Sequence, residues 1–337
     1  MERIRLGGTG LKVSPLAFGT MTLGNPVAED TSLELLDFVV DQGINFIDTA
    51  NGYNAGLSEE IIGKWMKARG NRERIVLATK VRYAVGGDPD TAGSTPKVIM
   101  REVENSLRRL NTDYIDIYYL HQPDDDTPIE ITWRALESLV SSGKVRYIGV
   151  SNFAAWQIVE AVNLARNRGW TPPTVTQALH NAISRAVETE LLPMTRSYDI
   201  GTCMYNPLAG GLLTGKYKVG KEADSDTRFA ANEMIRNEMN RKRNWNDPQR
   251  AAADQFSRIA AQSSRTSAEL ALRYMLDHPD VDVTLFGATR RDQVEQNLAA
   301  FTSSPLSAEE LKLCDAIWAE LHGPVPQYNR TNTRPQG

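Results

Sequence analysis

Short apolar segments recur along the chain, separated by longer amphipathic stretches. Eight of these segments are rich in Val, Ile, Tyr and Phe and are mostly apolar on both faces, which is typical of strands buried in a parallel sheet. They lie near residues 15–19, 44–49, 75–80, 114–120, 145–150, 174–177, 200–205 and 282–286. The pattern predicts a parallel sheet of eight strands.

Stretches with the apolar spacing of an α-helix follow these strands. Within residues 96–110, for example, Val98, Val103, Leu107 and Leu110 fall on one stripe. Helices are expected at residues 30–42, 58–69, 96–110, 128–142, 154–168, 188–198, 267–277 and 290–301, with an extra C-terminal helix at 307–322. Eight strand–helix units predict an α/β protein with a (β/α)8 TIM barrel, and a doubly wound open sheet is the alternative.

Three segments fall outside this repeat. Residues 4–6 and 12–14 flank a glycine-rich turn, which predicts an N-terminal β-hairpin lid. Residues 206–247 begin with a glycine-bearing run and continue as polar sequence without a clear strand, and a connection this long is typical of a functional or disordered loop. The tail, 323–337, is rich in Pro, Asn and Thr, so we expect it to be mobile or to fold across a pocket mouth. We expect residues 1–337 to form one barrel domain.

Four polar residues end or closely follow three successive predicted strands. Asp48, Lys80 and His121 each close an apolar run, and Tyr53 lies five residues after Asp48. Because the carboxyl ends of barrel strands form the catalytic face, we expect these side chains to converge there. Taken alone, each has an ordinary explanation as a cap, a loop aromatic, a surface charge or a core histidine. Their joint placement favours a catalytic set.

An acid, a phenol, an amine and an imidazole together suit protonation of a carbonyl oxygen. An unperturbed phenol has a pKa near ~10, and a nearby ammonium lowers it by favouring the phenolate. Lys80 is the candidate for this effect on Tyr53, and Asp48 is placed to keep Lys80 charged. His121 can donate a hydrogen bond to a developing oxyanion or orient a carbonyl.

Composition narrows the class of protein. A net charge of -4 gives no electrostatic reason to expect a nucleic acid partner. We find no apolar run of about 18 residues and no apolar core of a secretory signal, so neither a membrane span nor secretion is expected. Cys203 and Cys314 are far apart and suit free thiols in a reducing cytoplasm. The histidines are scattered without a His-Glu-x-x-His motif, so no metal site is expected.

These residues belong to a longer pattern that resembles the aldo-keto reductase superfamily. The matching stretches are residues 45–50 with Tyr53, 78–80, 120–121, 148–153, Gln177, 205–216 and 287–289. The resemblance extends over about residues 1–320 and rests on a specific combination of motifs.

The resemblance implies an NADPH-linked reductase of small aldehydes or ketones. Tyr53 would be the proton donor, tuned by Lys80 and Asp48. His121 would orient the substrate carbonyl. The residues implied in cofactor binding are Ser151, Asn152 and Gln177 at the carboxamide, Tyr205 stacked on the ring, and Pro207, Leu208, Gly210, Leu212, Lys216, Gly287, Ala288, Thr289, Arg291, Gln293 and Asn297 along the phosphates and the adenosine.

The glycine-bearing loops after the seventh and eighth predicted strands support a cofactor independently, because barrels commonly hold phosphates there. No Gly-x-Gly-x-x-Gly follows a strand, so a Rossmann site is not supported. The helix start after Gly287 would favour an anion, and Arg290 or Arg291 could add charge. Many NADPH-specific relatives carry Lys at the position of Gly287 and Arg at that of Gln293. We still favour NADPH, with NADH as the alternative cofactor.

Other functions remain as alternatives. Lys80 could form a Schiff base in an aldolase-like barrel. The chain also resembles the reductase-like β subunits of potassium channels, which keep the fold but serve a membrane partner. Residues 210–216 fit Gly-x-x-x-x-Gly-Lys, but Tyr217 stands where a P-loop needs Ser or Thr, which argues against nucleotide hydrolysis. The substrate would be chosen by the loops at 83–95, 122–127 and 206–247 and by the tail, with Tyr83, Trp245 and Tyr328 as candidate lining residues.

Overall fold

The eight predicted strands form a closed barrel. The computed structural model describes residues 1–217, 222–223, 229–230 and 235–323. The barrel strands are β3 (Leu16–Gly19), β4 (Phe46–Asp48), β5 (Val76–Val81), β6 (Ile115–Leu120), β7 (Val145–Ser151), β8 (Val175–Leu179), β9 (Gly201–Tyr205) and β10 (Val283–Phe286). They pair in the order β10-β3-β4-β5-β6-β7-β8-β9, and every pairing is parallel. Closure of β10 onto β3 confirms the (β/α)8 TIM barrel and excludes the open sheet.

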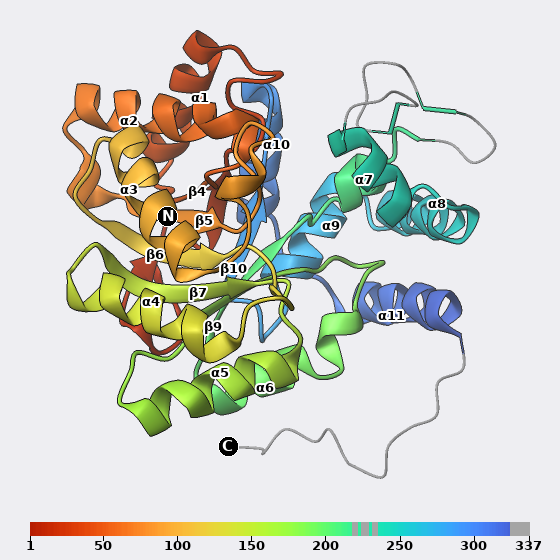
Figure 1. Ribbon diagram of the computed structural model, residues 1–337. Helices are drawn as coiled ribbons and strands as arrows, with labels where there is room; N and C mark the ends of the chain where they lie inside the picture. The colour runs from red at the N-terminus through yellow and green to blue at the C-terminus, as the bar shows by residue number, and fades with distance from the viewer. Residues whose placement is uncertain (218–221, 224–228, 231–234, 324–337) are drawn as a thin grey trace.

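Helices surround the barrel (Figure 1). They are α1 (Glu29–Asp41), α2 (Leu57–Arg69), α3 (Pro96–Leu110), α4 (Ile129–Ser141), α5 (Ala155–Arg168), α6 (Leu191–Tyr198), α7 (Ile235–Asn244), α8 (Asp247–Gln262), α9 (Ser267–Leu276), α10 (Arg291–Thr302) and α11 (Ala308–His322). Helices α1 to α6 follow β3 to β8 in turn, and α10 packs beside α1 to complete the ring. The extra C-terminal helix is confirmed as α11, which packs on α8.

Two helices were not predicted. Helix α7 lies within residues 206–247, which we expected to be an irregular loop, and α8 begins where that segment ends. The sequence of α7 contains few apolar residues, so it lacks the periodicity that identifies an amphipathic helix. Alanines make up most of the buried side of α8, and such small side chains give a weak periodic signal.

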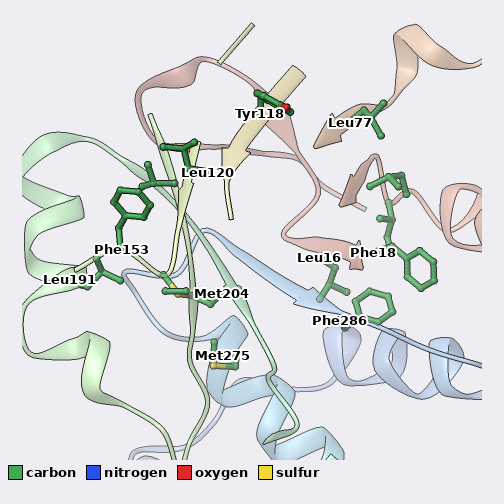
Figure 2. Packing of buried hydrophobic residues seen from close by; sticks show 14 of the residues in the cluster. Leu16, Phe18, Leu77, Tyr118, Leu120, Phe153, Leu191, Met204, Met275 and Phe286 are labelled. Carbon is green, nitrogen blue, oxygen red and sulfur yellow. The ribbon is translucent and has the colours of Figure 1, made fainter. Parts of the chain in front are cut away.

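Side chains alternate across the barrel wall. On β3, Leu16 and Phe18 belong to the apolar layer between the barrel and the helices, whereas Ala17 belongs to the barrel interior. Figure 2 shows part of the outer layer, where Phe18 meets Phe286 edge to face with 5.7 Å between the ring centroids. This outer layer holds the strands in place, so that their carboxyl ends present side chains from a rigid frame.

The N-terminal hairpin closes the end of the barrel opposite those carboxyl ends. Its elements are β1 (Ile4–Arg5), the 3-10 turn η1 (Gly7–Thr9) and β2 (Lys12–Val13). Leu6 and Val13 are fully buried in the interior cluster. Gly7 has φ of +44°, and a Cβ there would lie 2.1 Å from the backbone nitrogen of Gly201, so only glycine fits. The predicted lid is thus a plug at the amino-terminal end.

Other sequence-based expectations concern the termini, thiols and membrane. Cys203 and Cys314 are free and buried, as predicted. Among the described helices, none combines the length and the apolar character that a membrane span needs. The predicted mobile tail at 323–337 lies outside the described residues, apart from Gly323.

The carboxylate of Glu188 links the outer helices to the barrel. Oε1 of Glu188, in the loop after β8, accepts hydrogen bonds from His180 Nε2 at 2.8 Å and Tyr274 Oη at 2.9 Å. Arg185 donates to both carboxylate oxygens of Glu188 and also pairs with Asp315 on α11. Burial would raise the pKa of Glu188, but the bonds from His180 and Arg185 bring it down to about 2. The cluster therefore links the end of β8 to α9 and α11.

His278 lies against the same carboxylate. Its Nε2 is 3.7 Å from Glu188 Oε1, and its Nδ1 accepts a hydrogen bond from the backbone N–H of Asp280 at 3.2 Å. Burial, and then the neighbouring His180, lower the pKa of His278 to about 4. The ring is therefore neutral in the folded protein at pH values where an unfolded histidine, with a pKa of about 6.5, is already charged.

We expect stability to fall as the pH is lowered from about 6.5 to about 4, because the unfolded chain binds a proton at His278 that the folded protein excludes. The loss between pH 7 and pH 4.5 should be about 2–3 kcal/mol. Urea unfolding at pH 7, 5.5 and 4.5 measures it. In His278→Gln the slope over this window should flatten, and equal losses in the variant and the wild type would contradict the assignment.

Candidate active site

The barrel brings the four predicted side chains together at its carboxyl-terminal end. Lys80 Nζ, on β5, donates to Asp48 Oδ1 on β4 at 2.5 Å and to the backbone oxygen of Thr49 at 2.7 Å. The same ammonium lies 3.4 Å from Tyr53 Oη. The ring of His121, which follows β6, has its centroid 5.8 Å from that of Tyr53. The predicted convergence is confirmed as geometry.

Lys80 is fully buried, which is unusual for an ammonium. Burial by itself would lower the pKa of Lys80, but the Asp48 carboxylate and the Tyr53 phenol outweigh it, so the pKa is raised. The side chain therefore stays charged at neutral pH. A charged, fully engaged amine is a poor nucleophile for a Schiff base, which weighs against the aldolase alternative.

The pKa of Tyr53 differs from the expectation. Burial is the largest effect and raises the pKa of the phenol. Lys80 pulls the pKa down, as predicted, while Asp48 pushes it further up. Burial prevails, so the pKa is raised. The phenol therefore carries its proton at neutral pH, as a proton donor must.

His121 is neutral at the same pH. Burial, and then the positive charge of Lys80, hold the pKa of His121 well below its ordinary value. Its Nδ1 is buried without a hydrogen-bond partner in the described part of the chain. Tyr83 also packs edge to face with the imidazole, with 4.7 Å between ring centroids. A neutral imidazole still has one N–H that can bind a carbonyl oxygen.

A strained loop holds Tyr53 in place. The 3-10 turn η2 (Tyr53–Gly56) follows β4, and within it Asn54 and Ala55 have φ of +50° and +57°. The side-chain amide of Asn54 donates to the backbone oxygens of Met21 and Leu23, at 3.2 and 2.7 Å. These bonds compensate a conformation that non-glycine residues rarely adopt. Sequence reasoning did not identify Asn54, because its partners lie more than 30 residues away.

Ser151 and Asn152, which were predicted at the nicotinamide together with Tyr205, lie next to Tyr205 at the barrel rim. Asn152, with φ of +61°, donates to the backbone oxygen of His121 at 2.9 Å and to Ser151 Oγ at 3.1 Å. Its Oδ1 accepts from Tyr205 Oη at 2.8 Å. This network joins the ends of β6, β7 and β9. Gln177 lies deeper and donates to Asp48 Oδ2 at 2.8 Å, a contact that the sequence did not predict.

The loop after β9 is a compact turn that leads to an exposed lysine. The 3-10 segment η6 (Ala209–Thr214) contains Gly210 and Gly211 with φ of +70° and +101°. Pro207 and Leu212 are buried and Leu208 is half-buried, so the segment is anchored to the fold. Lys216 is exposed and makes no ion pair with a described residue. The N–H of Gly210 donates to Asn206 Oδ1 and that of Gly211 donates to the backbone oxygen of Leu208, so the charge of Lys216 is what this loop offers an anion.

The loop after β10 leads into α10. Gly287 is exposed, Ala288 is buried, and the backbone oxygen of Ala288 accepts from Thr22. Gln293 Oε1 accepts from the backbone N–H of Thr289 at 2.8 Å. This bond occupies the side chain of Gln293 within its own turn. Asn297 is buried on α10, one turn further on.

The two arginines at the start of α10 are both exposed and paired within their own turn. Arg290 bonds to Asp292 through two nitrogens, and Arg291 bonds to Glu295 at 3.0 Å. Exposed pairs of this kind contribute little to stability, so either guanidinium can be released to a stronger anion. The guanidinium of Arg291 also lies over the ring of Phe38 on α1, 4.1 Å from the ring centroid.

The candidate substrate-lining residues Tyr83 and Trp245 lie in different surroundings. Tyr83 is exposed beside His121, where it can contact a substrate. Trp245 instead packs in an aromatic cluster, stacked on Phe229 at 4.9 Å and edge to face with Tyr217 at 5.3 Å. Tyr328 lies outside the described residues.

One group in the described part of the chain brings histidine and carboxylate ligand atoms within 4.8 Å of one another: His180, Glu188 and His278. Their spacing in the sequence did not predict this proximity. The Glu188 carboxylate is already bound by Arg185, which is always protonated. A second cation would meet that guanidinium, so we interpret the cluster as a structural ion pair.

The chain matches known proteins over the whole barrel. The profile of the Aldo/keto reductase family matches residues 15–319. An uncharacterized oxidoreductase of Bacillus subtilis (strain 168), YrpG, is 36% identical over 97% of this chain and 99% of its own length. Aflatoxin B1 aldehyde reductase member 2 of Rattus norvegicus is 34% identical, covering 93% and 86% of the two chains. A probable voltage-gated potassium channel subunit beta of Arabidopsis thaliana is 38% identical, covering 91% and 93%.

We expect Asp48→Asn to lower the free energy of unfolding by about 3 kcal/mol, because it leaves the Lys80 ammonium buried without a negative partner. Adding Lys80→Met should recover most of the loss, since apolar packing can replace a buried ion pair. Urea unfolding at pH 7 measures both. Asp199→Asn, which breaks the exposed pair with Arg5, is the control and should change stability far less. A double variant no more stable than Asp48→Asn would refute this account.

Proposed function

This chain belongs to the aldo/keto reductase family, and from that premise we propose that it reduces an aldehyde or ketone to the alcohol with NADPH. Tyr53 would supply the proton, and the reduced nicotinamide would supply the hydride. The observation that carries the proposal is the 3.4 Å contact between Tyr53 Oη and the buried Lys80 ammonium. A protonated phenol beside a permanent positive charge suits proton delivery to a carbonyl oxygen.

Each catalytic side chain has a distinct role in this proposal. Tyr53 starts protonated because burial raises its pKa, and Lys80 stabilises the phenolate that forms when the proton leaves. Asp48 keeps Lys80 charged. Neutral His121 donates its ring N–H to the carbonyl oxygen and orients it toward Tyr53. Solvent then returns a proton to the phenolate.

The residues at the rim fit a dinucleotide. Ser151, Asn152 and Gln177 would bind the carboxamide, and Tyr205 would stack on the ring. The exposed Lys216, which makes no ion pair with a described residue, suits the diphosphate. The N-terminus of α10, with Gly287, Ala288, Thr289, Arg291, Gln293 and Asn297, suits the adenosine phosphate.

We favour NADPH over NADH because Arg290 and Arg291 are exposed and their ion pairs are surface pairs of low strength. A 2′-phosphate carries more charge than either partner carboxylate and would draw a guanidinium to itself. The free thiols suit a reducing cytoplasm, where we expect the enzyme to act. The carbonyl substrate would be a small molecule, and Tyr83 would be among the side chains that select it.

A regulatory subunit is the second candidate. The 38% identity to a probable potassium channel subunit beta favours it. The Asp48–Lys80–Tyr53 arrangement is complete, which favours a working enzyme. Sustained oxidation of NADPH with free carbonyl compounds, followed at 340 nm, would distinguish an enzyme from a protein that only binds the cofactor.

We expect Tyr53→Phe to reduce kcat by about 10²–10³-fold, the typical loss of one preorganised donor. Binding of NADPH, followed by quenching of tryptophan fluorescence, should be retained. Tyr147→Phe is the matched control, because it removes a phenol that bonds to Thr9 at the opposite end of the barrel. Ordinary turnover in Tyr53→Phe would overturn the assignment of the proton donor.

We expect the paired change Arg290→Gln and Arg291→Gln to raise the KM for NADPH about tenfold and leave the KM for NADH unchanged, because only NADPH carries the 2′-phosphate. Steady-state kinetics with both cofactors measure this. Arg258→Gln removes an exposed arginine of α8 that is also paired one turn away, and serves as the control. Equal changes for the two cofactors would argue against a phosphate contact.

A further inference from the structure

Gln177 and Asp48 meet across the barrel interior. Gln177 lies on β8 and Asp48 on β4, and the strand order places these two strands on opposite sides of the barrel. Their side chains are nonetheless in contact, with 2.8 Å between Gln177 Nε2 and Asp48 Oδ2. Gln177 is 3% exposed and Asp48 is 1% exposed, so water competes little for this bond.

The chemistry of the pair determines which way the amide points. An ionised carboxylate only accepts hydrogen bonds, so the NH₂ group of Gln177 must face Asp48. The carbonyl oxygen of the amide therefore points elsewhere, and no described residue donates to it. Cys203 Sγ lies 3.9 Å from Nε2, and the buried phenol of Tyr119 also interacts with the Gln177 side chain.

The two oxygens of Asp48 are divided between two donors. Oδ1 accepts from Lys80 and Oδ2 accepts from Gln177. With one donor on each oxygen, the carboxylate cannot rotate without breaking a buried bond, which is costly. The orientation of Asp48 toward Lys80, and hence of Lys80 toward Tyr53, depends on the amide from the opposite strand.

We propose that Gln177 is a positioning residue of the proton-donating group: it holds Asp48 through its NH₂ and leaves its carbonyl oxygen to the carboxamide of the nicotinamide. This inference rests on the proposed function for the second contact only. The bond to Asp48 joins two side chains of the protein, so its effect on Tyr53 can be tested apart from cofactor binding. One side chain thus links the proton donor to the place where the cofactor's amide would lie.

Loss of the Gln177 N–H would shift the pKa of Tyr53 in a definite direction. The N–H dipole of Gln177 offsets part of the negative charge of Asp48. Asp48 raises the pKa of Tyr53, so removing the dipole should raise that pKa further and make the phenolate harder to form. A residue that only bound the carboxamide would change cofactor affinity and leave the phenol unaffected.

Gln177→Met tests this, because methionine keeps the length of the side chain and removes both polar groups. Without cofactor, the phenolate of Tyr53 is titrated by ultraviolet difference spectroscopy, with Tyr53→Phe as the blank in each background. We expect the midpoint to move to higher pH in Gln177→Met. With saturating NADPH, kcat should fall about tenfold, as for one lost bond to a charged group. The alkaline limb of the pH profile of kcat should move to higher pH.

Ser151→Ala is the matched control, since Ser151 would also face the carboxamide but has no contact with Asp48 in the described structure. It should weaken NADPH binding and leave the titration of Tyr53 unchanged. A Gln177→Met protein with an unchanged midpoint and an unchanged pH profile would overturn the inference, whatever happens to cofactor affinity. A wild type that oxidises no NADPH with any carbonyl would refute the proposed function instead, and the cofactor-free titration would still decide the role of Gln177.

Gln177→Glu keeps the proposal testable if the methionine variant does not fold. A glutamic acid can donate to Asp48 only while the two carboxyl groups share a proton. We expect its kcat to approach that of the wild type at acid pH and to fall as that proton is lost. A profile parallel to that of the wild type over the whole range would count against the positioning role.

Discussion

Burial of the Lys80 ammonium in the barrel wall is the interaction on which the rest of the site depends. A buried charge costs several kcal/mol unless partners surround it. Asp48 and the backbone oxygen of Thr49 supply them, so β4, β5 and the loop between β4 and α2 must keep one arrangement. That loop carries Tyr53, and the bonds of Asn54 hold it in a strained conformation. The position of the phenol is thereby determined by the need to satisfy the amine.

The same burial sets the protonation states. Desolvation acts on Tyr53, Lys80 and His121 together and disfavours the charged form of each. Only Lys80 has an opposite charge in contact, and it alone stays ionised at neutral pH. The outcome is a protonated phenol, a charged ammonium and a neutral imidazole. This combination of protonation states is the one that the proposed proton transfer from Tyr53 requires.

The relatives show why the fold does not settle the activity. One relative is named an aldehyde reductase and another a probable channel subunit, and this chain matches the two at similar identity and coverage. A barrel can serve both roles, because its helices and interior provide the frame while the rim provides the site. What distinguishes the two is whether the carboxyl-terminal face can move a proton. The connected set from Gln177 through Asp48 and Lys80 to Tyr53 is the feature of this chain most directly concerned with that question.

The sequence by itself determined the eight strands, most of the helices and the placement of Asp48, Lys80 and His121 at strand ends, because hydrophobic period and strand boundaries are local properties of the chain. The unpredicted helices α7 and α8 have few large apolar residues to mark their period. Only the tertiary structure decided the bond between Gln177 and Asp48, which are 129 residues apart and meet because the barrel closes. It also decided the sign of the pKa shift of Tyr53, because burial depends on what packs around a side chain and not on its neighbours in sequence.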